Sequence, residues 1–264
     1  MHIIIFRTHF PNLQAIMPLF FHQYHRRSAD HIAGRSIHPF PPHEHWPKEW
    51  KTIYYKSYRG VPTIPLPQIV FPSANFFDLV SVRKSVRGGH NKGISAADLS
   101  VMLKYSCGLQ DIVRGEGEVR LRAQPSGGAR FPLEVYVLSL KKGNEISPGV
   151  YHYNVKQHAL DTLRIRNFSG EDIVHLLTYP WAKDCSMALI ITAVFNRCAM
   201  KYGERAYRYA LLEAGHIGQG VYLTGASRGV GVTGMGGTRD LALHNLLDID
   251  GTQESLVYAL MLSK

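Results

Sequence analysis

The amino-acid sequence predicts an α+β domain, in which helices and strands do not alternate strictly along the chain. A continuous apolar run at 187–195, MALIITAVF, is typical of a central buried strand. A long helix is predicted soon afterwards, over 204–227. The order of the other helices and strands differs from repeated βαβ units, and this order favours the α+β class.

The remaining elements follow in chain order. Apolar residues of 95–108 recur at helical spacing, with Ser95 as the expected N-cap and Gly108 as the stop. The segments 133–140 (LEVYVLSL) and 149–154 (GVYHYN) are predicted strands that form a hairpin or lie side by side. After the long helix, a short helix near 241–247 and a strand at 256–262 are expected.

The 264-residue chain has the composition of a globular protein, with 45% apolar and 19% charged residues. Its formal net charge is +10, and the basic residues are spread along the chain rather than gathered in tracts. Such a charge is typical of a solvated surface, or of a basic cleft for an anionic cofactor or an acidic partner. Nucleic-acid binding is not expected, because no basic block interleaved with aromatic residues is present.

Cysteine usage and the first residues predict a cytoplasmic protein that does not enter a membrane. The three cysteines, an odd number without CxxC spacing, indicate structural thiols in a reducing compartment. Arg7, His9 and Pro11 interrupt the apolar residues at the start, so neither a signal peptide nor a membrane span is predicted.

Residues 1–67 are predicted to form an N-terminal arm that packs on a core domain of residues 68–264. From residue 22 onward the arm is rich in His, Pro, Trp and Tyr and shows little periodicity. Four of its residues could suggest a metal site: His38, His43, Glu44 and His45. Their spacing in a Pro-rich loop favours a surface arm instead, and no metal is predicted.

The stretch VYLTGASRGVGVTG (221–234) locally resembles the strand and Gly-rich turn of a nicotinamide dehydrogenase. Only about one strand and one helix follow it, too few to complete a doubly wound sheet. We therefore interpret it as the end of the long helix followed by a turn, and the dehydrogenase hypothesis is rejected.

Three other stretches carry candidate chemistry, and the first is VRKSVRGGH (82–90). Arg83, Ser85 and Arg87 supply two guanidinium groups and a hydroxyl within five residues, which can surround a phosphate dianion. From these residues alone, a solvated basic turn is an equally good interpretation.

The second stretch is QPSGGARFPLEVY (124–136). Pro125 and Ser126 favour a turn, and Gly127 and Gly128 would let the backbone approach a flat ligand. The strand that follows would hold this turn rigidly, and a plain β-turn is the alternative.

The third stretch begins with Lys201 and Tyr202, between the buried strand and the long helix. The reference pKa of both side chains is about 10, so a base here needs a cationic neighbour that lowers its pKa. Arg205 and Arg208 are within reach by spacing. A surface Lys-Tyr pair that caps the helix is the alternative.

Taken in order, these motifs resemble those of the SagB-type flavin dehydrogenases, a branch of the nitroreductase superfamily. That branch includes the azoline oxidases of thiazole/oxazole-modified peptide pathways. The similarity extends from FHQYHRRS (21–28) through the three stretches to GMGGTRD (234–240). It implies a nitroreductase-like FMN-binding fold, with a central, mostly antiparallel sheet flanked by helices, in a homodimer with FMN at its interface.

The resemblance also implies roles for individual residues. The FMN phosphate would be held by Arg83, Ser85 and Arg87. The flavin ring would be bordered by residues of two glycine turns and of the long helix: Pro125, Ser126, Gly127, Gly128, Gln219, Gly236 and Gly237. Azoline oxidation is ascribed in the family to a Lys-Tyr pair, which Lys201 and Tyr202 match. Gly220 and Thr238 stand where the family usually has Asn and Phe, and substrate contacts are expected to differ accordingly.

The implied reaction is the two-electron oxidation of an azoline ring to an azole. Lys201 or Tyr202 would remove a proton, hydride would pass to flavin N5, and dioxygen would reoxidise the flavin. The alternatives are an NAD(P)H-dependent nitro- or ene-reductase and a flavin-holding scaffold subunit of a peptide-modifying complex. The expected substrate is a peptide or a peptide-derived heterocycle, and a cyclodehydratase-type or carrier-protein partner is expected with it.

Overall fold

The computed structural model describes residues 20–28, 41–69, 74–89, 92–114, 119–141 and 143–264. The chain divides into two compact units, residues 1–45 and 46–264. In its described part the first unit has helix α1 (Phe20–Arg27) and a 3-10 turn (His43–His45). His38 lies outside the described residues. Among the residues that are described, no group of three or more His, Cys, Asp or Glu side chains could hold a metal ion.

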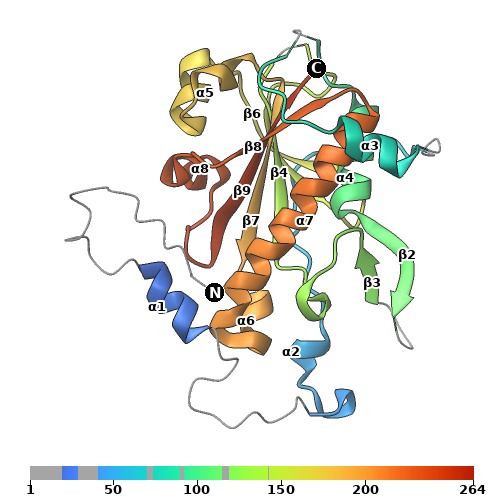
Figure 1. Cartoon of the computed structure of the whole chain (residues 1–264), viewed down its shortest axis with the longest axis vertical. Helices are drawn as coiled ribbons and strands as arrows, with labels where there is room; N and C mark the ends of the chain where they lie inside the picture. The colour runs from blue at the N-terminus through green and yellow to red at the C-terminus, as the bar shows by residue number, and fades with distance from the viewer. Residues whose placement is uncertain (1–19, 29–40, 70–73, 90–91, 115–118, 142) are drawn as a thin grey trace, which may run out of the picture. The chain divides into compact units, whose positions relative to one another are not determined.

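The second unit is built on a sheet whose neighbouring strands are all antiparallel (Figure 1). Within the described ranges the strand order is β1 (Thr63–Pro65), β6 (Ala159–Ile165), β5 (Gly149–Asn154), β4 (Leu133–Ser139), β7 (Met187–Val194), β9 (Glu254–Ser263), β8 (Gly231–Met235). A separate antiparallel pair is formed by β2 (Leu109–Arg114) and β3 (Val119–Arg122). The α+β class with a mostly antiparallel sheet is therefore confirmed.

Helices cover both faces of this sheet. One face carries α4 (Ala96–Cys107) and α7 (Ala206–Ser227), and the other carries α5 (Gly170–Leu177) and α8 (Asp240–Leu247). The side chains of β4 alternate between the two layers, as a strand requires. Val135 and Val137 pack with α4 and α7, whereas Tyr136 and Leu138 pack with α5 and α8. Strand β7 is buried on both faces in the same way, as its apolar sequence predicts.

The strongly periodic elements begin and end close to their predicted bounds. Ser95 Oγ accepts a hydrogen bond from Asp98 N at 3.0 Å at the start of α4, and Gly108 N donates to Lys104 O at its end. Strand β4 pairs with β5, so the two predicted strands are neighbours. Helix α7 ends at Ser227, as predicted, and the glycines after it lead into β8, a strand that the sequence did not predict.

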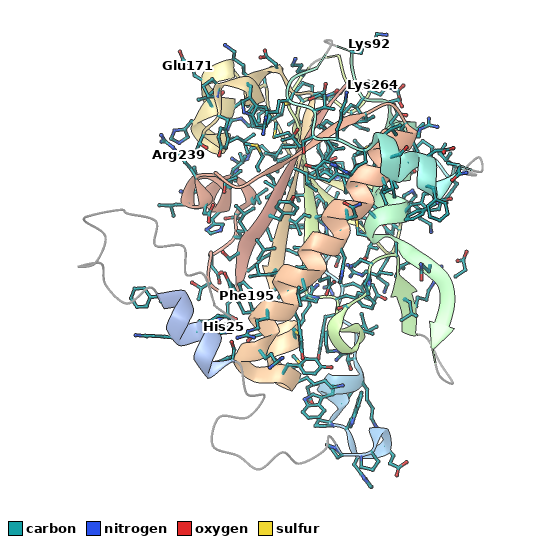
Figure 2. The ribbon with its side chains drawn as sticks, in the orientation of Figure 1. His25, Lys92, Glu171, Phe195, Arg239 and Lys264 are labelled. Carbon is teal, nitrogen blue, oxygen red and sulfur yellow. The ribbon has the colours of Figure 1, made fainter. Side chains whose placement is uncertain are left out.

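Short elements complete the second unit. They are α2 (Lys48–Lys51), α3 (Phe76–Val82), α6 (Asn196–Tyr202) and the 3-10 turns Gly127–Ala129, Pro180–Asp184 and Gly203–Arg205. Helix α6 follows β7 directly, and Phe195 N at this junction donates to Gln253 O at 3.2 Å (Figure 2). No helix of the described residues is long and apolar enough to cross a membrane.

Residues 46–67 lie within the larger unit. Strand β1 pairs with β6, and Lys56 Nζ lies 2.5 Å from Glu254 Oε2 at the start of β9. This segment therefore packs on the sheet through both backbone pairing and an ion pair. The packing of the earlier arm residues on the domain stays a prediction.

Candidate active site

The first motif is held in an extended conformation beside β8. Ser85 forms a parallel bridge with Val232, Val86 N donates to Val232 O at 3.0 Å, and Thr233 Oγ1 donates to Val86 O at 2.5 Å. These backbone contacts leave the Ser85 side chain exposed. We call this extended segment, residues 83–87, the platform. Its backbone contacts with β8 distinguish it from a loose basic turn.

Tyr222 of α7 joins this platform to strand β8. Its hydroxyl lies 3.1 Å from Ser85 Oγ and accepts a hydrogen bond from Gly234 N at 2.7 Å. The Arg83 guanidinium lies 5.5 Å from the centre of the Tyr222 ring, within the range of a cation–π contact. Arg83 and Ser85 therefore both contact a tyrosine that the sequence analysis did not single out, whereas the role of Arg83, Ser85 and Arg87 in holding a phosphate stays a prediction.

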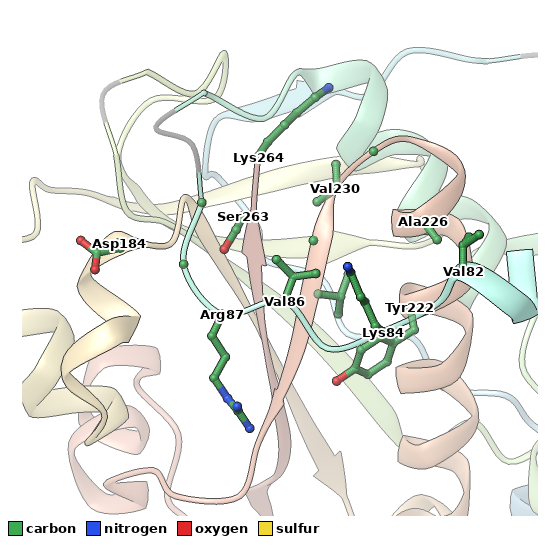
Figure 3. A pocket seen from close by; sticks show the side chains of 15 residues that line it. Val82, Lys84, Val86, Arg87, Asp184, Tyr222, Ala226, Val230, Ser263 and Lys264 are labelled. Carbon is green, nitrogen blue, oxygen red and sulfur yellow. The ribbon is translucent and has the colours of Figure 1, made fainter.

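A cavity of about 700 Å³ lies next to Tyr222 and is lined by Lys84 and Arg87. Figure 3 shows Lys84 beside Tyr222 and Arg87 extending in front of the sheet, whereas Lys264 points away from both. Lys264 Nζ instead lies 2.5 Å from Asp98 Oδ2. Three cationic residues thus line the cavity, Lys84, Arg87 and Lys264, and it is large enough for part of an anionic ligand. Arg83 and Ser85 of the first motif are not among its lining residues.

The second glycine turn, Gly236 and Gly237, borders a separate cavity of about 550 Å³. Gly237 O accepts a hydrogen bond from Thr178 Oγ1 at 3.0 Å, which holds the turn at the end of β8. A Cβ added to Gly236 would meet nothing within 4 Å. The backbone at Gly236 is therefore open to a ligand.

The first glycine turn contacts the Lys-Tyr pair directly. Gly128 has a φ of +61°, and a Cβ added there would lie 2.2 Å from Tyr202 Oη. A Cβ on Gly127 would lie 3.1 Å from the Tyr209 ring. Ser126 Oγ accepts a hydrogen bond from Phe131 N at 2.9 Å and so fixes the turn against β4. Two of the three predicted motifs are thereby brought together, and both glycines are needed because tyrosine side chains press on them.

Lys201 and Tyr202 occupy the last turn of α6, where Lys201 is buried and Tyr202 is half-buried. Lys201 is 8% exposed, and burial lowers its pKa, with the nearby Arg130 guanidinium acting in the same direction. Burial raises the pKa of Tyr202. Arg130, a residue of the first glycine turn, is a cation whose field reaches both side chains, in addition to the Arg205 and Arg208 that spacing along the sequence suggests.

Helix α6 is anchored to the sheet by a row of buried charged side chains. Arg197 Nη1 lies 2.5 Å from Glu134 Oε1, and Glu134 Oε2 lies 2.8 Å from His152 Nε2. The other ring nitrogen of His152 lies 3.4 Å from Asp161 Oδ2. Burial opposes a charge on His152, but its hydrogen bonds to the two carboxylates raise its pKa overall. Because Arg197 lies four residues before Lys201, this row fixes the helix that presents the Lys-Tyr pair.

Glu213 of α7 is a candidate functional residue that the sequence analysis missed. It is 2% exposed, its Oε1 accepts a hydrogen bond from Gln124 Nε2 at 3.1 Å, and burial raises its pKa to about 7. Its Oε2 has no hydrogen-bond partner in the described part of the chain. With Ser126, Gly127 and Pro125 it lines a cavity of about 160 Å³. A carboxyl group in the apolar helix stretch ALLEAGHIG was the signal that could have found it.

The two groups of candidate residues lie at opposite ends of α7. Tyr209 contacts the first glycine turn and Tyr222 contacts the first motif, and thirteen residues at a rise of 1.5 Å place them about 20 Å apart. Gln219 lies between them and is exposed. One copy of the chain therefore presents two half-sites rather than one closed pocket.

The chain belongs to the nitroreductase family. The sequence profile of that family matches residues 80–264. The matched region contains all three motifs and leaves residues 1–79, with α2 and β1, outside it.

Three relatives show what kinds of protein this chain is similar to. MJ1384 of Methanocaldococcus jannaschii, which bears a nitroreductase name, is 30% identical over 65% of this chain and 83% of its own length. The trifolitoxin-processing protein TfxB of Rhizobium leguminosarum bv. trifolii is 29% identical over 80% of this chain and 59% of its own length. The microcin B17-processing protein McbC of Escherichia coli is 33% identical over 40% of each chain. The chain thus spans less than two thirds of either processing protein in these matches.

Solved structures share the fold. A crystal structure from Anabaena variabilis, described as a nitroreductase, has a TM-score of 0.68 at 28% identity and covers 91% of this chain and 45% of that one. A chain of the E. coli microcin synthetase McbBCD complex, solved with truncated pro-MccB17 bound, has a TM-score of 0.58 at 20% identity, over 93% of this chain and 91% of that one. The expected nitroreductase-like fold is therefore confirmed, and the two processing proteins support the SagB-type branch.

Proposed function

We propose that this protein is an FMN-dependent oxidoreductase that oxidises azoline rings of a peptide-derived substrate to azoles. The observation that carries the proposal is the close approach of Tyr202 Oη to Gly128, next to the buried Lys201, which supports a joint role for the Lys-Tyr pair and the first glycine turn. The names of the processing relatives TfxB and McbC support a peptide substrate. A cytoplasmic location and a cyclodehydratase-type or carrier-protein partner belong to the same proposal.

The residues of the first motif fit the phosphate of FMN. Arg83, Ser85 and Arg87 lie on one rigid segment, and Arg87 and Lys84 line the adjacent cavity. Charge-assisted hydrogen bonds from these groups would hold a phosphate dianion, and the open backbone at Gly236 would border the flavin ring. Bound FMN would supply the acceptor for a hydride and pass the electrons to dioxygen.

Within the Lys-Tyr pair, we assign the removal of the substrate proton to Lys201. Its lowered pKa increases the fraction of neutral amine at a given pH, which a base requires. The raised pKa of Tyr202 keeps its hydroxyl protonated, so that it serves as a hydrogen-bond donor that orients the substrate.

A homodimer would unite the two half-sites. The first motif and the Lys-Tyr pair lie about 20 Å apart along α7, so a second copy would bring its own glycine turn near the first motif. Helices α3 and α7 also expose large apolar side chains that a partner copy could cover: Phe76, Phe77, Val80, Val82, Leu211 and Leu212. This exposed apolar surface supports the dimer.

The first experiment is the visible absorption spectrum of the purified protein, with identification of any released chromophore. FMN at about one per subunit is expected from the phosphate motif. The yellow protein is then mixed with a synthetic thiazoline-containing peptide in air, and the loss of two hydrogens is followed by mass spectrometry. Rapid bleaching of the flavin by NADPH, without oxidation of the peptide, would overturn the oxidase proposal in favour of a reductase. Oxidation only after addition of a cyclodehydratase would assign the chain to a subunit of a larger complex.

A further inference from the structure

Helix α2 is fastened to both elements that form the candidate active site. Trp50 Nε1 donates a hydrogen bond to Met200 O of α6 at 3.0 Å, and Arg130 Nη1 of the first glycine turn donates to Glu49 O at 3.0 Å. Figure 1 shows α2 and α6 at the same end of α7. A short helix that the family profile does not include thus lies against the Lys-Tyr pair.

Aromatic rings from this segment surround the Lys201 amine. Lys201 Nζ lies 3.3 Å from the centre of the Trp46 ring, 5.6 Å from that of Trp50 and 5.5 Å from that of Tyr202. The two tryptophan rings pack edge to face, with their centres 6.1 Å apart. We call the rings of Trp46, Trp50 and Tyr202 the aromatic cage.

The local sequence WPKEW explains how the cage is formed. Pro47 is the N-cap of α2, and a proline disfavours helical backbone at the residue before it, so Trp46 stays outside the helix. Trp50 lies within the single turn of α2 and Trp46 lies just before it, and their rings pack edge to face. The hydrogen bond from Trp50 Nε1 to Met200 O holds this pair against α6.

The cage and Arg130 have opposite effects on a positive charge at Lys201. The buried guanidinium of Arg130 acts on Lys201 with like charge, so an amine without other contacts would be displaced from it. A tryptophan face attracts an ammonium group, most strongly where water is excluded. The cage therefore stabilises the positive charge that Lys201 gains when it takes up the substrate proton, and it offsets the repulsion of that charge by Arg130.

We propose that the aromatic cage positions the Lys201 amine for reaction, with Trp46 as the positioning residue. This inference rests on the proposed function, in which Lys201 removes the substrate proton. Two of the three residues of the cage, Trp46 and Trp50, then precede residues 80–264, the part of the chain that the family profile matches.

The cage can be tested without substrate. In protein labelled with 13C at lysine Cε, the Lys201 methylene protons are expected to resonate upfield of the other lysines, because they lie over the Trp46 ring. The variant Lys201→Arg identifies the signal by its loss. Trp46→Leu should return the signal to the ordinary lysine position, whereas the matched control Trp181→Leu should not, since Trp181 stacks on Tyr179 elsewhere. A Lys201 signal among the other lysines in the unaltered protein would overturn the cage.

The positioning role has a kinetic test. With the thiazoline peptide, Trp46→Leu should lower kcat about 10- to 30-fold, the fold-change that corresponds to loss of a desolvated cation–π contact, and should change KM less than about twofold. Trp46→Phe should recover most of kcat, because it restores an aromatic face, and FMN content should be equal in all variants. Unchanged kcat in Trp46→Leu, or no recovery in Trp46→Phe, would refute the role of the ring. If the unaltered protein does not oxidise the peptide, the proposed function fails, and the lysine spectrum still decides whether the cage exists.

Discussion

Replacing Glu213 by Gln should remove a strong pH dependence of stability. The carboxyl group is 2% exposed, and burial raises its pKa from 4.5 to about 7. The folded chain therefore binds a proton at Glu213 more tightly than the unfolded chain does. Between about pH 4.5 and pH 7 the stability of the folded state falls as the pH rises, and the stabilisation is lost once the pH exceeds the folded pKa.

The size of the effect follows from the shift. About 2.5 pKa units at 1.36 kcal/mol each amount to about 3 kcal/mol, which is a large fraction of the stability of a typical domain. A glutamine keeps the shape and cannot ionise. Its amide can pair with Gln124, whose Oε1 has no hydrogen-bond partner among the described residues, if the Gln124 amide rotates.

The assay is urea unfolding of both proteins at a series of pH values from 5 to 8, with the difference in unfolding free energy plotted against pH. Subtraction cancels every other titrating group, and Glu171→Gln, on the exposed side of α5, serves as the matched control. The Glu213 variant should gain about 2.5 kcal/mol relative to the unaltered protein between pH 5 and pH 8. Parallel curves for the two proteins would refute the claim that Glu213 is buried without adequate hydrogen bonding.

Three further predictions concern the candidate site. Arg83→Ala should weaken FMN binding about 10- to 100-fold through loss of a charge-assisted contact, measured as flavin per subunit after dialysis, and unchanged flavin would reject the phosphate role. Lys201→Ala should retain FMN and lower turnover of the thiazoline peptide by about 100-fold or more, whereas full activity would exclude Lys201 as the base. Gly128→Ala should lower the turnover and the thermal midpoint of the flavin-free protein, because the new Cβ would lie 2.2 Å from Tyr202 Oη at a positive φ, while Gly236→Ala, which enters open space, should leave that flavin-free midpoint unchanged. Equal midpoints for the two glycine variants would contradict the close contact.

The helices and strands that the sequence predicts correctly are those with a long apolar or periodic run within their own residues. Strand β7 and helix α7 have long apolar or periodic runs, and both occur where predicted. Strands β1, β6 and β8 were missed because they are short or mixed in polarity, and the first and last of them contain Pro or Gly. They lie at or next to the sheet edges, where pairing with a partner strand outweighs weak strand propensity.

The candidate site was predictable in part for a related reason. Arg83 and Ser85 are close in sequence, so spacing alone could suggest that they act together, although it fitted a solvated basic turn equally well. Trp46, Tyr222 and Glu213 join the site from distant segments, and a single sequence carries no signal of which distant side chains will meet. Each of these contacts depends on how the helices pack on the sheet, and that packing is not encoded in any local motif.

The charged row beneath α6 has a calorimetric consequence. His152 lies between two carboxylates, and both of its ring nitrogens must carry hydrogens to donate to them. The pKa of His152 is higher in the folded chain than its ordinary value of 6.5, and the pKa of Glu213 is raised to about 7. Near neutral pH the chain therefore takes up protons at both side chains as it folds. The buffer must release those protons. The heat of folding of this protein will therefore include the ionisation enthalpy of whatever buffer surrounds it.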